Sequence, residues 1–330
     1  MISVLCAMGL LAAWSCVHEI PEGGDENASV EVTLDLNLNQ AVTQHQTVEY
    51  GTKAASSATA RYLVRFFPYV GENHLTVTPY EFSFSADALS SRSLKMEVPP
   101  FNYHIEVWAD WTDGDKPYYN ADNFGAISAV TDPYTGGSEF RDALCGSIDA
   151  DLTVYKENQS SHKADIALHR PNARYEFIAT DKDKFFTRVS AIRATKAGGA
   201  AEDQSSIFLS DFTVEIIYSQ FLPYTYNLHT GLVIDSASGV KFQTSMTELE
   251  DGTVNIGWDW VMAKDEESVV VVSIAFYDKD GSFISSLDDI MVPLCPGKKT
   301  TVKGNLLTSN MGGGLSIDPS FDGEIVVPIN

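Results

Sequence analysis

Few residues in this sequence have the types and spacing that catalysis or metal binding requires. The seven histidines are scattered, and none of them forms the HxH or HxxxH pair that places two imidazoles on one metal ion. No GxSxG nucleophile elbow and no Walker phosphate loop occurs. The sequence therefore predicts no catalytic residue, no metal site and no cofactor.

The most metal-like stretch is DWTDGD, from Asp110 to Asp115. Its three carboxylates suit Ca²⁺, but the stretch lacks the alternating acids and the later Glu of an EF-type loop. A polar turn at the end of a strand is the favoured interpretation. The Gly-rich residues 310–315 lack the Lys of a phosphate loop and are predicted to form a surface loop.

Cysteine is scarce, and no CxxC pair occurs among the 4 cysteines. Cys6 lies inside an apolar leader and Cys16 ends it, which leaves Cys145 and Cys295 for the rest of the chain. A disulfide between these two is one interpretation. Two small buried thiols is the other, and it is favoured.

Aromatic residues make up 11% of the chain, and four tryptophans lie in two close pairs. Exposed aromatic rings would favour carbohydrate stacking. In alternating strands, one ring of each pair is normally in the core and the other is partly covered. The core interpretation is favoured for Trp108, Trp111, Trp258 and Trp260.

These four tryptophans lie in segments whose apolar and polar side chains alternate with a period of two. In residues 29–39, SVEVTLDLNLN, every second side chain is apolar, which is typical of a half-buried antiparallel strand. No helix is predicted, and many short strands bounded by turn residues indicate an all-β sandwich fold. The other predicted strand segments are 61–70, 78–86, 93–98, 102–111, 173–181, 206–219, 230–235, 252–263, 268–287, 299–309 and 324–329.

A polar stretch without periodicity, residues 156–165, is the best candidate linker. It divides the chain of 330 residues into an N-terminal β-sandwich, 29–160, and a C-terminal β-sandwich, 161–330. The formal net charge of −23 argues against nucleic acid as a partner, because phosphate binding needs clustered Lys and Arg.

The start of the chain resembles the leader of a lipoprotein. Residues 1–15 are mostly apolar, too short to span a bilayer as a helix, and are predicted to be a signal peptide. The sequence before Cys16 resembles a lipobox, so Cys16 is the predicted lipidation site, where acyl chains such as palmitate would hold the protein to a membrane. Residues 16–28 then form an acidic tether. The alternative is an ordinary cleaved signal with an incidental cysteine.

An ordered set of segments resembles one known family, the fimbrillin-associated anchor and minor-subunit lipoproteins of Bacteroidia (the FimB-like group). The resemblance covers about residues 16–323. The segments that carry it are CVHEIP (16–21), PPFNYHIEVWAD (99–110), YYN (118–120), RDALCGS (141–147), LHRPNARYEFIATD (168–181) and the tail 297–323.

The resemblance implies two tandem transthyretin-like (Greek-key) β-sandwich domains on a non-enzymatic outer-membrane lipoprotein. It implies a fimbrial anchor or accessory subunit, with other fimbrial subunits as partners through β-strand exchange. In related shaft subunits, a protease that cuts after basic residues removes the first strand. A surface glycan- or ligand-binding lipoprotein is the alternative function.

The position of the first basic residue distinguishes an anchor from a shaft subunit. No Lys or Arg occurs before Lys53, so the first predicted strand contains no site for such a protease. We therefore expect this strand to stay in place, as in an anchor or base subunit. A cut at Lys53 or Arg61 is the alternative.

Overall fold

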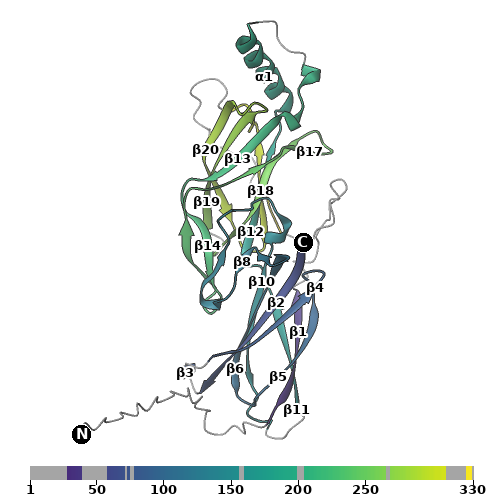
Figure 1. The fold of residues 1–330 in the computed structure, drawn as a ribbon, viewed down its shortest axis with the longest axis vertical. Helices are drawn as coiled ribbons and strands as arrows, with labels where there is room; N and C mark the ends of the chain where they lie inside the picture. Colours follow the sequence, from purple (N-terminus) through teal and green to yellow (C-terminus); the bar gives the residue numbers. More distant parts are fainter. Residues whose placement is uncertain are drawn as a thin grey trace, which may run out of the picture.

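A computed structural model describes residues 28–38, 58–70, 73–74, 78–155, 160–198, 204–264, 268–309 and 325–328. Within these residues the fold is all-β apart from one α-helix and four short 3₁₀ turns. Two β-sandwiches lie end to end along the long axis of the molecule, and helix α1 (Lys182–Ala197) lies at the far end of the C-terminal one (Figure 1).

The N-terminal sandwich packs a three-stranded sheet of order β11-β1-β5 against a sheet of order β10-β6-β2-β3, in which β4 also pairs with β2 and β7 with β6. Its core comes from both sheets and includes the alternating inner residues of β1 and β2. The strands are β1 (Val30–Leu38), β2 (Ala58–Val70), β3 (Asn73–His74), β4 (Tyr80–Ala86), β5 (Arg92–Val98), β6 (Asn102–Asp113), β7 (Lys116–Pro117), β10 (Leu144–Asp151) and β11 (Ser160–Leu168).

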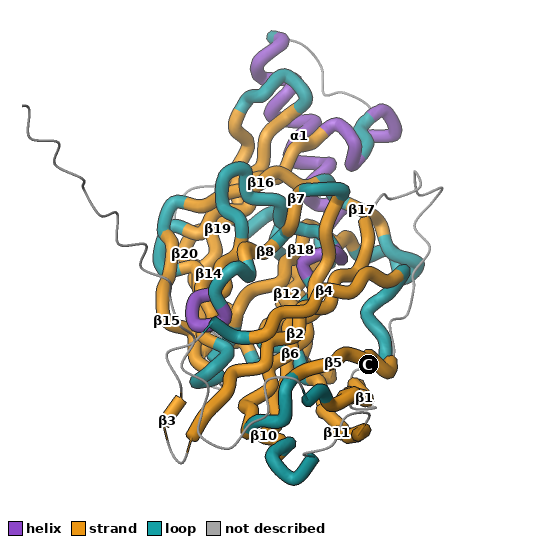
Figure 2. Tube along the Cα trace, turned by 60° about the horizontal axis from the view of Figure 1, so that its bottom comes forward, coloured by secondary structure: helices purple, strands orange, loops and turns teal. Residues whose placement is uncertain are grey.

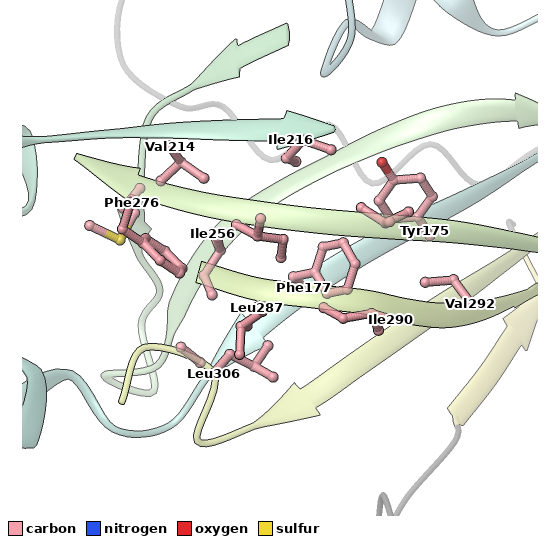
Figure 3. Packing of buried hydrophobic residues seen from close by; sticks show 14 of the residues in the cluster. Tyr175, Phe177, Val214, Ile216, Ile256, Phe276, Leu287, Ile290, Val292 and Leu306 are labelled. Atoms are coloured by element: carbon pink, nitrogen blue, oxygen red, sulfur yellow. The ribbon is translucent and has the colours of Figure 1, made fainter. Parts of the chain in front are cut away.

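The C-terminal sandwich packs a sheet of order β17-β18-β12-β21-β22 against a sheet of order β16-β13-β19-β20. Figure 3 shows how side chains of both sheets interdigitate in its core, with Phe177 of one sheet near Ile290 of the other. The strands are β12 (Asn172–Ala179), β13 (Phe212–Tyr218), β16 (Val240–Thr244), β17 (Thr247–Glu248), β18 (Val254–Met262), β19 (Ser268–Asp278), β20 (Phe283–Leu294), β21 (Lys298–Gly304) and β22 (Ile325–Pro328).

Both sandwiches use the same Greek-key strand order. The pairing of the main N-terminal strands is repeated in the C-terminal sandwich. In chain order, the N-terminal strands are β1, β2, β4, β5, β6, β10 and β11, and their C-terminal counterparts are β12, β13, β16, β18, β19, β20 and β21. In each, the first strand lies between an antiparallel and a parallel neighbour, and the parallel neighbour is the seventh strand. The predicted tandem of β-sandwiches is therefore confirmed.

A small fifth sheet connects the two sandwiches. Its order is β15-β14-β9-β8, with β8 (Tyr119–Asn120) and β9 (Ile127–Ala129) from the N-terminal half of the chain and β14 (Leu222–Asn227) and β15 (Leu232–Ala237) from the C-terminal half. Around it lies a cluster of buried side chains that we call the junction cluster: Trp108, Tyr119, Ala121, Phe124, Ile127, Ala129, Ala143, Cys145, Tyr226, Leu228 and Met262. Main-chain pairing between the halves thus fixes one sandwich on the other.

The predicted linker differs from the structure. Residues 160–168 form β11, which pairs in parallel with β1 along its whole length and so belongs to the N-terminal sandwich. The reason is visible in the sequence, since Ala164, Ile166 and Leu168 alternate with polar residues and all three are buried. The chain crosses to the C-terminal sandwich at 169–172, and the division at 160/161 into two domains stays a prediction.

The prediction that the chain contains no helix is wrong. Helix α1 has a narrow apolar side, where Phe185 and Val189 are buried against the C-terminal core, while charged residues occupy much of its remaining surface. Gly198, with φ 64°, ends the helix in the left-handed conformation. Phe185 and Val189 lie about one helical turn apart, and two buried apolar positions are too weak a pattern to predict a helix from the sequence.

Candidate functional site

Strand β1 occupies the centre of its sheet. It pairs with β11 from Val30 to Leu38 and with β5 from Val30 to Leu36, so hydrogen-bonding neighbours flank it on both sides. Val30, Val32, Leu34 and Leu36 point into the core and are at most 1% exposed. The predicted strand is confirmed, and it has a parallel as well as an antiparallel neighbour.

The outer face of β1 is held by ion pairs at the surface. Lys95 Nζ lies 3.0 Å from Glu31 Oε1, and Lys163 Nζ lies 2.5 Å from Asp35 Oδ2. Such exposed pairs contribute little to stability, because solvent screens them. Backbone pairing and apolar burial therefore account for most of the affinity of the sandwich for this strand.

Asp259, between Trp258 and Trp260 on β18, is the central buried charge between the sandwiches. The hydroxyls of Tyr134 and Tyr218 donate to its Oδ2 over 2.7 and 2.6 Å, and Arg141 Nε lies 3.6 Å from its Oδ1. Burial raises the pKa of Asp259, and the Arg141 charge and the tyrosine donors act against that rise. Because Tyr134 and Arg141 precede β10 in the chain, this network ties the N-terminal half to the C-terminal core.

A second buried ion pair lies beside the first. Arg170 donates to both carboxylate oxygens of Asp142 over 2.7 and 2.9 Å. The Tyr119 hydroxyl and the Asn172 amide both donate to the carbonyl oxygen of Arg141. These residues belong to the segments RDALCGS, YYN and LHRPNARY, so the segments that carry the family resemblance build the joint between the sandwiches.

The carboxylate that begins the metal-like stretch is already paired. Arg61 donates to both oxygens of Asp110 over 2.8 and 2.7 Å, and Trp108 Nε1 donates to its Oδ2. The chain then turns at Gly114, with φ 59°, between β6 and β7. The polar turn is confirmed, and within the described residues no group of three or more His, Cys, Asp or Glu could hold a metal ion.

Cys145 and His169 form a close pair that the sequence did not indicate. The Cys145 Sγ lies 3.4 Å from His169 Nε2, where β10 meets the start of the crossing segment. Burial raises the pKa of the Cys145 thiol to about 12 and lowers the pKa of His169. The thiol is therefore protonated at neutral pH and is not an activated nucleophile. No disulfide joins Cys145 and Cys295, and Cys145 is buried as expected whereas Cys295 is only half-buried.

Two histidines meet at a buried carboxylate on the side of the joint. Glu106 is fully buried, and its Oε1 lies 3.3 Å from His104 Nε2 and 2.8 Å from His229 Nδ1. Asp149 contacts the other ring nitrogen of His104 at 2.7 Å. The Glu106 interaction mainly, and Asp149 after it, raise the pKa of His104 to about 9. His229 comes from the turn between β14 and β15, so this cluster also spans the joint.

The tryptophans follow the core interpretation. Trp108 and Trp260 are fully buried, whereas Trp111 and Trp258 are partly covered. The guanidinium of Arg174 lies 3.9 Å from the centre of the Trp258 ring. These four rings pack within the protein and do not form an open stacking platform.

Other predicted features lie outside the described residues. These are Cys16, the signal peptide 1–15, the acidic tether as far as residue 27, and the Gly-rich residues 310–315. Helix α1, the α-helix of the described residues, is too short and polar to cross a membrane.

The fold and the joint define an all-β protein of two sandwiches connected by a shared sheet, whose buried polar groups mainly bind one another. The chain belongs to a family of unknown function (DUF6562), whose sequence model matches residues 23–330. No curated protein matches the chain.

Several solved structures resemble the chain at low identity. A candidate polysaccharide-binding protein of Bacteroides thetaiotaomicron is 13% identical, with 78% of this chain and 80% of that chain covered and a TM-score of 0.42. The fimbrial anchor protein Mfa2 of Porphyromonas gingivalis is 12% identical, with 78% and 82% covered and a TM-score of 0.36. A candidate cell adhesion protein of Bacteroides ovatus is 12% identical, with 84% and 92% covered and a TM-score of 0.44.

Proposed function

We propose that this protein is a non-enzymatic outer-membrane lipoprotein that acts as a fimbrial anchor or minor subunit. The observation that carries the proposal is the first strand. It is a central strand of its sheet, and no Lys or Arg precedes Lys53 in the chain. A protease that cuts after basic residues has no site within β1 or before it. The protein is therefore suited to end or hold a fimbrium with its own first strand in place.

Attachment to other subunits would use β-strand addition. In this mode the main chain of an incoming strand satisfies the free hydrogen-bonding groups of a sheet edge, and alternate side chains set the register. A protein with several sheets and long edge strands offers such edges. Other fimbrial subunits are the proposed partners.

A non-enzymatic role agrees with the chemistry of the buried groups. The carboxylates of Asp110, Asp142 and Asp259 are paired with arginines or bonded to tyrosines, and the Cys145 thiol is protonated. Buried groups paired in this way are typical of a structural role. Lipid attachment at Cys16 would place the two sandwiches on the outer membrane.

Mass spectrometry of the mature protein from native membranes tests this proposal. The expected mature chain begins with an acylated Cys16 and contains residues 29–39 intact. A mature form on native fimbriae that begins near residue 54 or 62 would contradict the anchor role. Affinity purification from the same membranes should recover fimbrial subunits, whereas retention of glycan without a protein partner favours a glycan-binding lipoprotein.

A further inference from the structure

The sheet that connects the sandwiches ends in an uncovered edge at β15. Among the described strands, β15 pairs only with β14, and it lies at the rim of the molecule (Figure 2). Val233 packs against the junction cluster, so Leu232 and Ile234 point to the opposite face, where they are 42% and 50% exposed. Asp235 is the one charged residue of the strand, and its carboxylate accepts a hydrogen bond from Tyr224.

The other long edges of the described sheets carry the charges that normally protect an edge. Charged side chains discourage the pairing of a further strand. The charged edge residues are Lys163 and Asp165 on β11, Lys95 on β5, Glu81 on β4, Lys241 on β16, Asp149 and Asp151 on β10, and Asp288 and Asp289 on β20. Strand β20 also exposes Phe283 and Met291. Strand β15 carries one charge, Asp235, which accepts a hydrogen bond from Tyr224, and it exposes two aliphatic side chains on one face.

The partner that can pair with the free edge of β15 along its length is an extended polypeptide. The free side of an edge strand is a row of backbone N–H and C=O groups at the spacing of another strand. A glycan or a helix cannot pair with that row along its length. The connecting sheet already joins two parts of the molecule through main-chain pairs, between β14 and β9, and an added strand would continue that interface.

We infer that β15 is the edge at which a strand from another fimbrial subunit is added, with apolar side chains beside Leu232 and Ile234. The inference rests on the proposed function and names the docking edge for it. A strand added there would extend the sheet shared by both sandwiches. The bound subunit would then attach to the connecting sheet and not to the sheet that contains β1.

A binding experiment with the full chain tests this assignment. The probe is purified fimbriae from the cells that produce the protein. The variants Leu232→Lys and Ile234→Lys place a charge on the exposed face of β15, and Val269→Lys and Met291→Lys are matched controls at exposed apolar positions on β19 and β20. We expect each β15 variant to weaken binding by about tenfold, since each aliphatic side chain would otherwise be buried by the partner. The controls should bind as the unmodified chain does.

Hydrogen exchange of the complex provides a second readout, which does not depend on substitution. Amides of β15 should become protected when fimbriae bind. Unchanged binding of both β15 variants, with new protection at another edge such as β11, overturns this inference and leaves the proposed function standing. If the unmodified chain does not bind fimbriae, the proposed function fails and this inference fails with it.

Discussion

The two sandwiches have the same strand order but hold their first strands differently. In the C-terminal sandwich, the first residues of β12 include Asn172 and Arg174, which form hydrogen bonds to Arg141 and Glu139 of the N-terminal half. The Tyr175 hydroxyl forms a buried hydrogen bond with the hydroxyl of Tyr218. The parallel neighbour of β12 is itself covered by β22. In the N-terminal sandwich, β1 has apolar contacts inside and exposed ion pairs outside. The first strand of the C-terminal sandwich is therefore held by buried polar contacts as well as by apolar burial, whereas β1 is held by apolar burial and backbone pairing.

The largest expected effect comes from removal of β1. A chain that begins at Ala58 would lose four fully buried side chains and both backbone ladders of β1. We expect the amides of β5 and β11 to lose protection from hydrogen exchange, while β13 and β19 keep theirs. A peptide of residues 29–38 added in trans should restore protection in the N-terminal sandwich.

The control for this experiment is the same peptide with Leu34→Lys, which places a charge in the core and should not bind. If β5 and β11 remain as protected in the shortened chain as in the full chain, β1 is not an essential strand of its sheet.

The second effect concerns the buried charge of the joint. Asp259→Ala leaves Arg141 buried without its carboxylate, and such a loss typically costs about 3–5 kcal/mol of the free energy of unfolding. Tyr134→Phe removes one hydrogen bond to the same carboxylate and should cost about 1 kcal/mol. Denaturant unfolding measures both. Equal, small costs for the two variants would show that the network is not what locks the C-terminal sandwich.

The sequence predicts the alternating strands well because their signal is local. Every second residue from Val30 to Leu36 of β1 is apolar and buried, and the predicted strand segment 268–287 contains β19 and the start of β20. The strand β11 was missed because its first four residues, SSHK, are all polar and the alternation begins only at Ala164. Local patterns therefore predict which segments form strands more reliably than they predict the residue at which a strand begins.

The joint could not be predicted because its partners are far apart in the chain. Tyr134 and Asp259 are separated by 125 positions, and Glu106 and His229 by 123. No spacing rule relates such residues before the topology is known. The family resemblance singled out Arg141 and Arg170 as motif residues, but only the structure shows that both lie in the joint.

A third, smaller effect compares one buried strand glycine in each sandwich, Gly146 of β10 and Gly257 of β18. A Cβ on Gly146 would lie 2.7 Å from the carbonyl oxygen of Ala167, a main-chain atom of β11 that cannot move freely. A Cβ on Gly257 would lie 2.6 Å from Ile216 Cδ1 and 2.8 Å from Thr244 Cγ2, which are side-chain and not main-chain atoms. We expect Gly146→Ala to cost about 1–3 kcal/mol of unfolding free energy and Gly257→Ala to cost less. Thermal unfolding of the two variants checks the order, and the reverse order would contradict it.

The smallest expected effect is a pH dependence on the N-terminal side of the joint. Because Glu106 and Asp149 raise the pKa of His104 from 6.5 to about 9, the folded protein holds this proton more tightly than the unfolded chain. The stabilisation is complete below pH 6.5 and is lost as the pH rises through about 9. Unfolding of the N-terminal sandwich should therefore become easier across that window in the unmodified protein and change less in His104→Gln. An equal decline in both proteins would assign the pH dependence to other groups, and His229→Gln would then test the second histidine that contacts Glu106.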